Sequence, residues 1–502
     1  MQEISDIGPV KLSIAPQRAS GNCKACKEWR GGRKNQNPDS QIDGAIKRLR
    51  RARHLAQADL AASLGISASY LNLIEHNRRK VTVPLLFAIA GYFGVEPGDL
   101  VDSDEGRLLG DLMEVFGDDL FADSDLTNLD IRDLVQANPA AARAMLRLYD
   151  RYRLVGKSGS AANAPGQAEP FHLATDAISD FLQENANHFP ALEAAADRIR
   201  ADIDRTADSL ELGLRSYLLN VFGIEQRLAS LPQGIARQLD AARQQLLIAD
   251  ILPTESALFL TAHQLGGLAA GREIDAIIAA ANLPEGDAPA LAANVLAAYF
   301  AAALVMPYAP FLRACRDYRY DIERIARRFG ASFEQVCHRM TTLQRPGASG
   351  IPLHLVRTDI AGNISKRFSL SGIHIPRHSG ACPRWNIYSA FLSPERINLQ
   401  LSQMPDGQRY FCIARTIVKG DHRYNAPRRY LSIGLGCAIQ HAREMIYADG
   451  MDLTGDSQLV PIGVGCRICP RLQCGQRAHP PADHRFELDP GQRPESLYGH
   501  MG

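Results

Sequence analysis

The stretch Gln57–Glu75, QADLAASLGISASYLNLIE, decides the fold of the N-terminal part of the chain. Its first helical run begins at Gln57 and stops at Gly65, a residue type that commonly closes a helix in the left-handed conformation. Ser67 stands where an N-cap would accept a backbone hydrogen bond at the start of a second helix. Gly65 to Ser67 then form a turn of helix-turn-helix length. We therefore expect a small helical bundle over residues 42–100.

Charge is distributed unevenly around this segment. The whole chain of 502 residues has a formal net charge of +1. Residues 45–95 nevertheless carry eight Lys and Arg against two acids, a net charge of +6. Residues 101–133 carry eleven acids against two Arg, a net charge of −9. The near-neutral total is a cancellation of two separated fields, and the basic one is suited to a phosphate backbone.

The basic segment predicts an interface with double-stranded operator DNA. In helix-turn-helix units, the N-terminal part of the second helix of the motif points at base edges. The expected base-reading residues are Ser67, Ser69, Tyr70 and Asn72. Phosphate contacts that fix the register are expected from Arg50, Arg53, Gln57, Arg78 and Arg79. The alternative is a helical bundle with a solvated basic face.

The chain is long enough for about three domains. Residues 1–41 read as a flexible extension, whose lone pair Cys23 and Cys26 cannot fill four coordination positions. Residues 101–168 read as an acidic connector with a short helix at 140–152 and a linker at 156–167. Residues 169–345 are dominated by Ala, Leu and Ile at helical spacing and read as a mostly helical domain, and residues 346–502 read as an α+β domain. Strands are expected at 351–358, 368–375, 396–401 and 410–418. The predicted fold class is multidomain and mainly α.

The composition favours a cytoplasmic protein. The N-terminus has no signal-peptide pattern. The apolar run from Val295 to Met306 is shorter than the roughly 20 residues that a bilayer requires. Ten cysteines in so long a chain do not form a disulfide scaffold, so their clustering indicates ligation of a metal or a cluster.

The middle domain carries a broken peptidase motif. Zinc peptidases place His-Glu-x-x-His on a helix, where two His hold zinc and the Glu activates water. Here His263 is followed by Gln264, and Gly267 stands at the second His position. We therefore expect no catalytic residue and no enzyme activity; a zinc peptidase remains the competing hypothesis. The later apolar helix carries Tyr299, which lies either in a core or beside a cavity.

The strongest chemical signal lies in residues 463–481. Cys466, Cys469 and Cys474 are spaced C-x2-C-x4-C in a loop bounded by Gly and Pro. Such a loop can ligate an iron–sulfur cluster or a zinc ion. Zinc would need a fourth ligand, for which Cys382, Cys412, Cys437 and His479 are available. A purely structural cysteine loop is the third reading.

Several segments together resemble one family. They are residues 69–77 (SYLNLIEHN), 299–308 (YFAAALVMPY), 329–347 (FGASFEQVCHRMTTLQRPG), 361–368 (AGNISKRF), 380–386 (GACPRWN) and 463–481. The order of a Cro-type helix-turn-helix, a degenerate ImmA/IrrE-like peptidase domain and a Cys-rich C-terminal domain resembles the short-chain fatty acyl transcriptional regulators.

The resemblance implies a homodimeric regulator of propionate or acetate metabolism genes that senses an acyl-CoA. It also implies a 4Fe–4S cluster at Cys466, Cys469 and Cys474, for which we take Cys382 as the fourth ligand. An acyl-CoA site needs cations and an aromatic face for the phosphates and the adenine. On those grounds the candidate residues are Arg215, Tyr299, Arg345, Asn363, Lys366 and Arg367.

Overall fold

The computed structural model describes residues 46, 50, 55, 57–75, 81–93, 103–121, 126, 128–158, 169–377, 380–420 and 427–480. The chain divides into two compact units, residues 1–102 and residues 103–502. The predicted extension at 1–41, with Cys23 and Cys26, lies outside the described residues.

The first unit contains the predicted helical bundle. Its helices are α3 (Gln57–Ser63), α4 (Ala68–Glu75) and α5 (Val83–Phe93). Apolar residues at helical spacing close one core, which contains Ile46, Leu60, Ala61, Leu71, Ile74, Leu85, Ile89 and Phe93. The expected helix bounds around the turn are confirmed.

The second unit begins with helices that the sequence interpretation treated as a connector. They are α6 (Ser103–Phe116), the short 3-10 turn η3 (Asp119–Phe121), α7 (Asn128–Ala137) and α8 (Pro139–Ser158). α6, α7 and α8 share a small apolar core that contains Leu112, Ile131 and Ala142. The expected linker at 156–167 was placed too early, because α8 continues through Ser158.

Further helices surround the middle of this unit. They are α9 (Glu169–Glu184), α10 (Pro190–Thr206), α11 (Leu210–Phe222), α12 (Thr254–Ala269), α13 (Gly271–Ala280), α14 (Ala288–Val305), α15 (Tyr308–Asp317), α16 (Ile322–Phe329) and α17 (Phe333–Thr341). α14 is the central one, and it packs against α9, α10, α12, α13 and α17.

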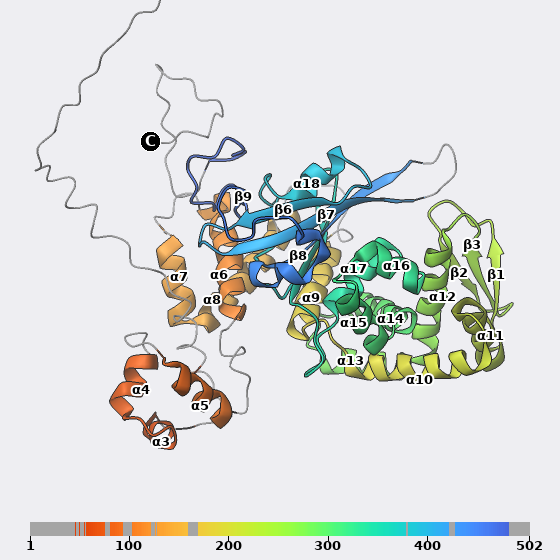
Figure 1. Ribbon diagram of the computed structural model, residues 1–502, viewed down its shortest axis with the longest axis horizontal. Coiled ribbons are helices and arrows are strands. Elements are labelled where there is room, and N and C mark those ends of the chain that lie inside the picture. Colours follow the sequence, from red (N-terminus) through yellow and green to blue (C-terminus); the bar gives the residue numbers. More distant parts are fainter. Residues whose placement is uncertain are drawn as a thin grey trace, which may run out of the picture. The chain divides into compact units, whose positions relative to one another are not determined.

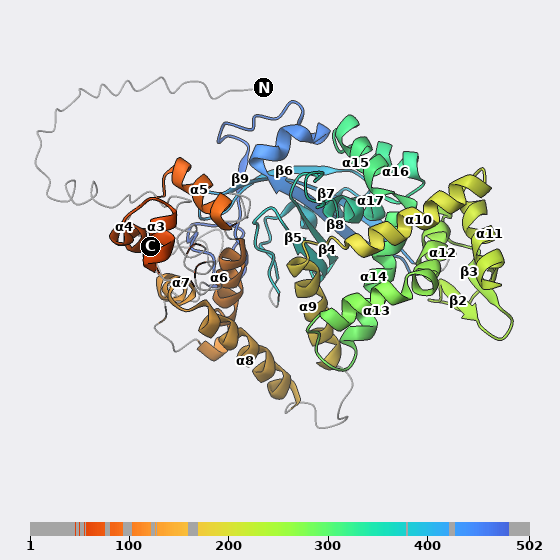
Figure 2. The same cartoon turned by 90° about the horizontal axis from the view of Figure 1, so that it is seen from below.

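The middle domain is mostly helical, as expected, but it also contains a small sheet that the sequence did not predict. Residues 225–249 form a three-stranded sheet in the order β1 (Glu225–Ala229), β3 (Gln245–Ala249), β2 (Arg237–Asp240). Figures 1 and 2 show this sheet at the far end of the second unit from β9. The strands are short and polar on one face, so they lack the apolar alternation on which the sequence prediction relied.

The C-terminal half contains a six-stranded sheet in the order β5-β4-β8-β7-β6-β9 (Figure 1). The strands are β4 (Leu353–Asp359), β5 (Ile364–Ser369), β6 (Asn398–Gln403), β7 (Arg409–Lys419), β8 (Arg429–Ala438) and β9 (Leu459–Pro461). Short helical turns accompany them: α18 (Asn386–Ser389), η4 (Ala390–Leu392), η5 (Ile439–Glu444) and η6 (Ile446–Ala448). All neighbouring strands are antiparallel except β6 and β9.

Two strand predictions need correction. The strand expected at 368–375 ends at Ser369, because Gly372 turns the chain with a φ of 88°. β8 was missed, because its glycines weaken the strand pattern. A Cβ at Gly434 would lie 2.6 Å from the Ile387 side chain, and one at Gly436 would lie 2.6 Å from the Phe411 carbonyl. The packing of β8 therefore requires the same glycines that weaken its strand pattern in the sequence.

α14 is long and apolar enough to cross a membrane by length and composition, and it alone meets that test among the described residues. The helix begins at Ala288, seven residues before the apolar run considered above. Ten of its residues are buried in the protein. This packing accounts for its apolar composition.

A buried ion pair joins the middle of the unit. Arg339 on α17 and Glu193 on α10 have side chains that are 0% and 1% exposed. Arg339 donates two hydrogen bonds to the carboxylate, of 2.6 and 2.9 Å, and one to the Met306 carbonyl. The Tyr299 hydroxyl donates a further bond to Glu193, of 2.7 Å. The pair therefore fixes α10, α14 and α17 together.

We expect Glu193→Gln to lower the free energy of unfolding by about 3–5 kcal/mol, because Arg339 would keep its burial and lose its carboxylate partner. Urea unfolding followed by circular dichroism measures the change. Glu273→Gln is the control, since it removes only the exposed pair with Arg198 and should cost less than about 1 kcal/mol. Equal losses in the two variants would contradict the expectation.

Candidate functional site

The turn of the helix-turn-helix unit has the backbone that its sequence predicts. Gly65 has a φ of 68°, in the left-handed region. The Ser67 hydroxyl accepts a hydrogen bond of 3.1 Å from the Tyr70 backbone N–H and so caps α4. The first turn of α4 is therefore fixed on the core below it.

The predicted base-reading side chains lie at this turn. Ser67, Ser69 and Asn72 are exposed, and Tyr70 is half-buried against the core. Gln57 Nε2 donates to Asn72 Oδ1 at 3.4 Å, which joins the starts of α3 and α4 on one surface.

The predicted phosphate contacts are less completely described. The Arg50 guanidinium donates to the Leu55 carbonyl at 3.0 Å, so it also supports the fold. Arg53, Arg78 and Arg79 lie outside the described residues. The roles of these side chains toward DNA stay predictions.

The position that a peptidase would use for zinc has another environment. His263 Nδ1 lies 2.9 Å from the Arg237 guanidinium, and Nε2 lies 3.2 Å from the Asn294 carbonyl. Burial and the Arg237 charge lower the pKa of His263. A cation beside the imidazole disfavours a metal ion, and Gly267 faces open space where the second His would stand.

Four predicted cysteine ligands meet in one place. Cys382, Cys466, Cys469 and Cys474 line a common cavity. The Cys382 N–H donates to the Val464 carbonyl at 2.8 Å, which ties the two segments together. Trp385 adds a second tie through a bond of 3.0 Å to the Gly463 carbonyl.

The other sequence candidates for a fourth ligand lie elsewhere. Cys412 Sγ is 3.5 Å from His354 Nε2 within the sheet, and Cys437 Sγ contacts Met445 Sδ at 3.9 Å. Both thiols are buried among core side chains. The cavity lining does not include His479.

Arg477 shapes the cysteine loop from inside. Its guanidinium donates to the carbonyls of Cys466, Cys469 and Arg471 at 2.6 to 2.8 Å. The side chain lines the cavity, and its buried Nε has no hydrogen-bond partner among the described residues. Burial raises the pKa of the Cys469 thiol, and the charges of Arg477 and Arg471 oppose that shift.

The thiols of this cavity are the ligand type of both a zinc ion and an iron–sulfur cluster. Zinc requires its thiolates at about 2.3 Å from one point. Within the described ranges, no group of three or more His, Cys, Asp or Glu is arranged to hold one metal ion. An iron–sulfur cluster distributes its thiolates over several irons, and it carries negative charge that the unpaired Arg477 Nε could face.

A second polar site lies where α17 meets the six-stranded sheet. The Glu334 side chain is 8% exposed and accepts from Arg357 at 2.8 Å and from Lys419 at 2.7 Å. Lys366 Nζ lies 3.9 Å from the same carboxylate and 3.3 Å from His338 Nε2. Three cations thus surround one carboxylate. We call these five residues the Glu334 cluster.

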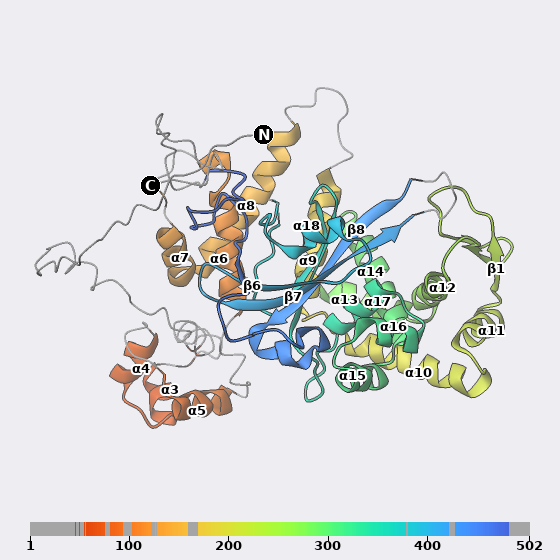
Figure 3. The same ribbon diagram turned by 45° about the horizontal axis from the view of Figure 1, so that its top comes forward.

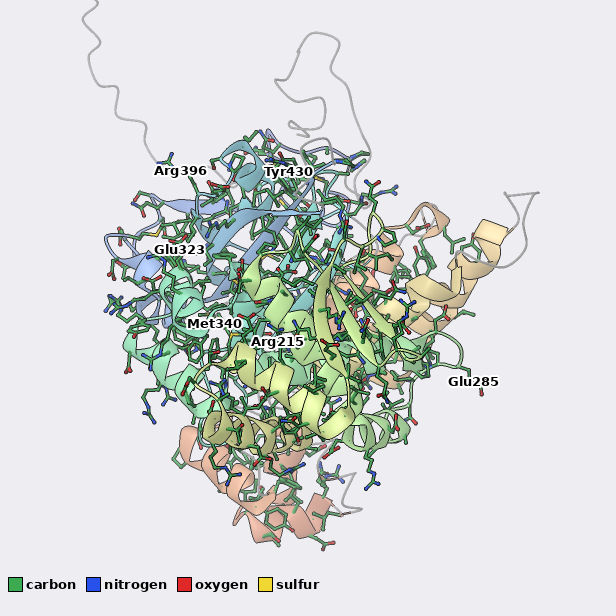
Figure 4. The ribbon with its side chains drawn as sticks, turned by 90° about the vertical axis from the view of Figure 1, so that its right-hand side faces the viewer. Arg215, Glu285, Glu323, Met340, Arg396 and Tyr430 are labelled. Carbon is green, nitrogen blue, oxygen red and sulfur yellow. The ribbon has the colours of Figure 1, made fainter. Side chains whose placement is uncertain are left out.

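Strand register explains why the cations meet. Arg357 on β4 stands opposite Lys366 on β5, so the two side chains share one face of the sheet. On β7, Arg415 lies in the same cross-strand row, and Lys419 follows four residues later on the same face. Arg415 pairs at 2.8 Å with Glu323 of α16, a residue labelled in Figure 4.

The Glu334 cluster has a surplus of two positive charges near neutral pH. Burial would raise the pKa of the Glu334 carboxyl, but His338, Lys419 and Lys366 hold it far below its usual range. Burial lowers the pKa of His338 to about 3, so this imidazole is neutral. Burial, together with the charges of Arg357 and Lys419, lowers the pKa of Lys366 to about 8, although Glu334 raises it. Such a site favours a further anion.

The remaining predicted ligand residues do not gather around the Glu334 cluster. Arg215 is exposed on α11 (Figure 4). Tyr299 is 6% exposed, with its hydroxyl held by Glu193. The Arg345 guanidinium lies 4.1 Å from the centre of the Tyr308 ring. Asn363 closes the β4–β5 turn by bonding Asp359 at 2.8 Å.

Arg367 faces the opposite side of the sheet from Lys366. It pairs with Asp176 Oδ1 at 3.0 Å and lines a cavity beside α6 and α9. His374 and Arg377 also line this cavity. Of the predicted acyl-CoA residues, the structure therefore places only Lys366 in the Glu334 cluster.

Sequence reasoning missed Glu334, Arg357, Lys419 and His338. Each is an isolated charge in the sequence. The strand order β5-β4-β8-β7 and the packing of α17 against β4 bring them together. His338 and Glu334 are four residues apart on one helix face, which was the one local signal.

Protein families match three successive segments of the chain, and these segments agree with the features described above. Residues 46–100 match a helix-turn-helix family, and residues 220–341 match the IrrE N-terminal-like domain. Residues 342–498 match the C-terminal domain of the short-chain fatty acyl coenzyme A regulators.

Similar proteins cover nearly the whole chain. "HTH-type transcriptional regulator RamB" of Mycobacterium tuberculosis (strain ATCC 25618 / H37Rv) is 35% identical over 466 residues, which are 91% of this chain and 98% of that protein. "Propionyl-CoA carboxylase regulator" of Cereibacter sphaeroides is 38% identical and covers 89% and 96%. "HTH-type transcriptional regulator PrpR" of Mycobacterium tuberculosis is 35% identical and covers 88% and 92%.

A solved structure also matches. It is described as "Mycobacterium tuberculosis transcriptional regulator", with 38% sequence identity and a TM-score of 0.62. The match covers 65% of this chain and 99% of the solved chain.

We expect Glu334→Gln to lower the free energy of unfolding by about 1–3 kcal/mol, because three cations would then repel one another without a counter-charge. The pKa of Glu334 in the folded protein lies below the ordinary value of 4.5. Its stabilisation is therefore fully present above that value and is lost as the pH falls toward the folded-state pKa.

The difference between wild type and Glu334→Gln should consequently be larger at about pH 7 than at about pH 3. Urea unfolding at both pH values measures it. Glu323→Gln is the matched control, since that carboxylate is 52% exposed and should contribute less than about 1 kcal/mol. A difference that is the same at both pH values would contradict the assignment.

Proposed function

The chain belongs to the short-chain fatty acyl coenzyme A regulator family, and we propose that it binds operator DNA, senses a short-chain acyl-CoA and carries a 4Fe–4S cluster. It is a DNA-binding transcriptional regulator and not an enzyme. The arrangement that supports the proposal most directly is the meeting of Cys382, Cys466, Cys469 and Cys474 around one cavity.

The DNA-binding function rests on the helix-turn-helix unit. The capped start of α4 presents Ser67, Ser69 and Asn72 to solvent. Asn side chains can bond two edge atoms of adenine, which gives Asn72 a role in reading sequence. We propose that a homodimer places two such units on half-sites roughly 34 Å apart.

The structure of the IrrE-like region agrees with a regulator. Arg237 occupies the neighbourhood of His263 where a peptidase would need further metal ligands. The domain therefore serves as a scaffold, on which α12 and α14 pack at Gly266 without room for a Cβ.

The cysteine cavity would hold the cluster. The four thiols would ligate its irons, and Arg477 would offset its charge through the Nε that has no partner within the described residues. When bound, a cluster of this kind supplies a centre that oxidants can alter. The chain contributes the ligands, the positively charged wall and the loop geometry set by Trp385 and Gly463.

If the cysteine cavity holds an iron–sulfur cluster, the protein solution should be coloured. Protein purified anaerobically and reconstituted with ferrous iron and sulfide should absorb broadly near roughly 400 nm. Cys469→Ser should lose most of this absorbance, because one ligand of the cavity is removed. Cys437→Ser is the matched control, since this buried thiol lies in the sheet and should leave the spectrum unchanged.

A colourless wild-type protein that binds one zinc ion per chain would replace the cluster with a structural zinc module. Equal loss of absorbance in both variants would show that the cavity is not the site of the colour.

The Glu334 cluster supports an acyl-CoA effector. Coenzyme A carries a diphosphate and a 3′-phosphate, and phosphates pair with Lys and Arg in charge-assisted hydrogen bonds. Lys366 and Lys419 have side chains that are 45% and 39% exposed, so both can be reached from solvent while they face Glu334. We propose that phosphates of the effector bind here.

This proposal predicts a selective loss of effector binding. Lys366→Gln should weaken the binding of propionyl-CoA about tenfold or more in calorimetry, because one cation at the phosphates is lost. Arg272→Gln on α13 is the control for a change of surface charge.

A duplex selected from a random DNA library then serves as the operator in gel shifts with propionyl-CoA, acetyl-CoA and free CoA. Wild type should show a different operator affinity with at least one acyl-CoA, since an effector acts only through unequal affinity for two states. Identical affinities with all three compounds would exclude the sensing role.

A further inference from the structure

α6 has two faces with different partners. Leu108, Leu112 and Val115 lie on one face, where Leu108 and Leu112 belong to the core shared with α7 and α8. Gly110, Glu114 and the following Gly117 lie on the opposite side at helical spacing, and all are buried. A buried face without large apolar side chains indicates a close and specific contact.

One half of this contact is electrostatic. Arg377 NH2 lies 2.9 Å from Asp111 and 2.6 Å from Asp180 of α9. The Arg377 backbone N–H donates to Glu114 at 2.8 Å. The carboxylates raise the pKa of Arg377, and the arginine is only 14% exposed. Two acids of the segment 101–133 are therefore paired within the second unit.

The other half is steric and involves the cysteine loop. A Cβ at Gly117 would lie 2.8 Å from the Ile468 side chain, which stands between Cys466 and Cys469. A Cβ at Gly110 would overlap the His374 ring. Figures 1 and 3 show the dark-blue loop beside α6. The contact leaves little room for the loop to move without displacing α6.

We propose that the state of the cysteine loop is transmitted to α6 through the contact of Ile468 with Gly117. The inference rests on the proposed function only in that the cavity thiols ligate an inorganic group. Ligation fixes Cys466 and Cys469, and Ile468 between them then holds the end of α6. Release of the thiols moves Ile468 and loosens α6, the first helix that follows the DNA-binding unit in the chain.

Hydrogen exchange of the full-length protein tests the coupling. Three samples are compared: protein reconstituted with iron and sulfide, apo protein, and apo protein whose thiols are blocked with N-ethylmaleimide. We expect amides of residues 110–117 to exchange about tenfold faster when the thiols are blocked than when the protein is reconstituted. Amides of α14 should not change.

Two variants locate the contact. Ile468→Ala should abolish the difference between the samples, since the loop then no longer touches Gly117. Gly117→Ala should accelerate exchange even in reconstituted protein. Gly106→Ala is the matched control on the same helix, because a Cβ at Gly106 would meet no atom within 4 Å. If Gly117→Ala does not fold, Ile468→Ala still decides the matter.

Equal exchange at 110–117 in all three samples, with labelling of the thiols verified by mass spectrometry, would overturn the coupling. Failure of the cluster proposal gives a different pattern. The reconstituted sample would be colourless, while the comparison of blocked with unblocked thiols would still report on Ile468 and Gly117.

Discussion

The buried pair of Arg339 and Glu193 is the constraint on which the second unit depends. Two charges removed from water are tolerated only when each has a partner of good geometry, and here the two terminal guanidinium nitrogens each donate to one carboxylate oxygen. The same arginine bonds the end of α14 through Met306. α17 is thereby held in one orientation, and Glu334 at its start faces the sheet. The core ion pair thus positions Glu334 within the Glu334 cluster.

The sequence predicted best where local chemistry alone determines the structure. Gly65 and Ser67 define the turn between α3 and α4 by backbone preference and capping, and both positions are confirmed. The cysteines are similar, because a short spacing already confines three thiols to one loop. Cys382 lies 84 residues before Cys466, yet the bond from its N–H to Val464 brings it to the same cavity.

The sequence predicted least where long-range packing decides. β8 contains Gly434 and Gly436, which a propensity scale reads as weak strand formers, but close neighbours on both faces of the sheet exclude a Cβ. The charges of the Glu334 cluster come from α17 and from the strands β4, β5 and β7, so no short window of sequence contains them. The acidic run at 101–133 was read as part of a connector, whereas Asp111 and Glu114 are buried within the second unit.

The attachment of α6 also has a consequence for biosynthesis. Glu114 and its partner Arg377 are 263 residues apart. At a ribosomal rate of about 5–20 residues per second, roughly 13 to 50 seconds separate their appearance. During that interval the helix-turn-helix unit can already be complete, while α6 still lacks its contacts with Arg377. A nascent chain therefore holds a complete helix-turn-helix unit before α6 gains the contacts that attach it to the C-terminal half.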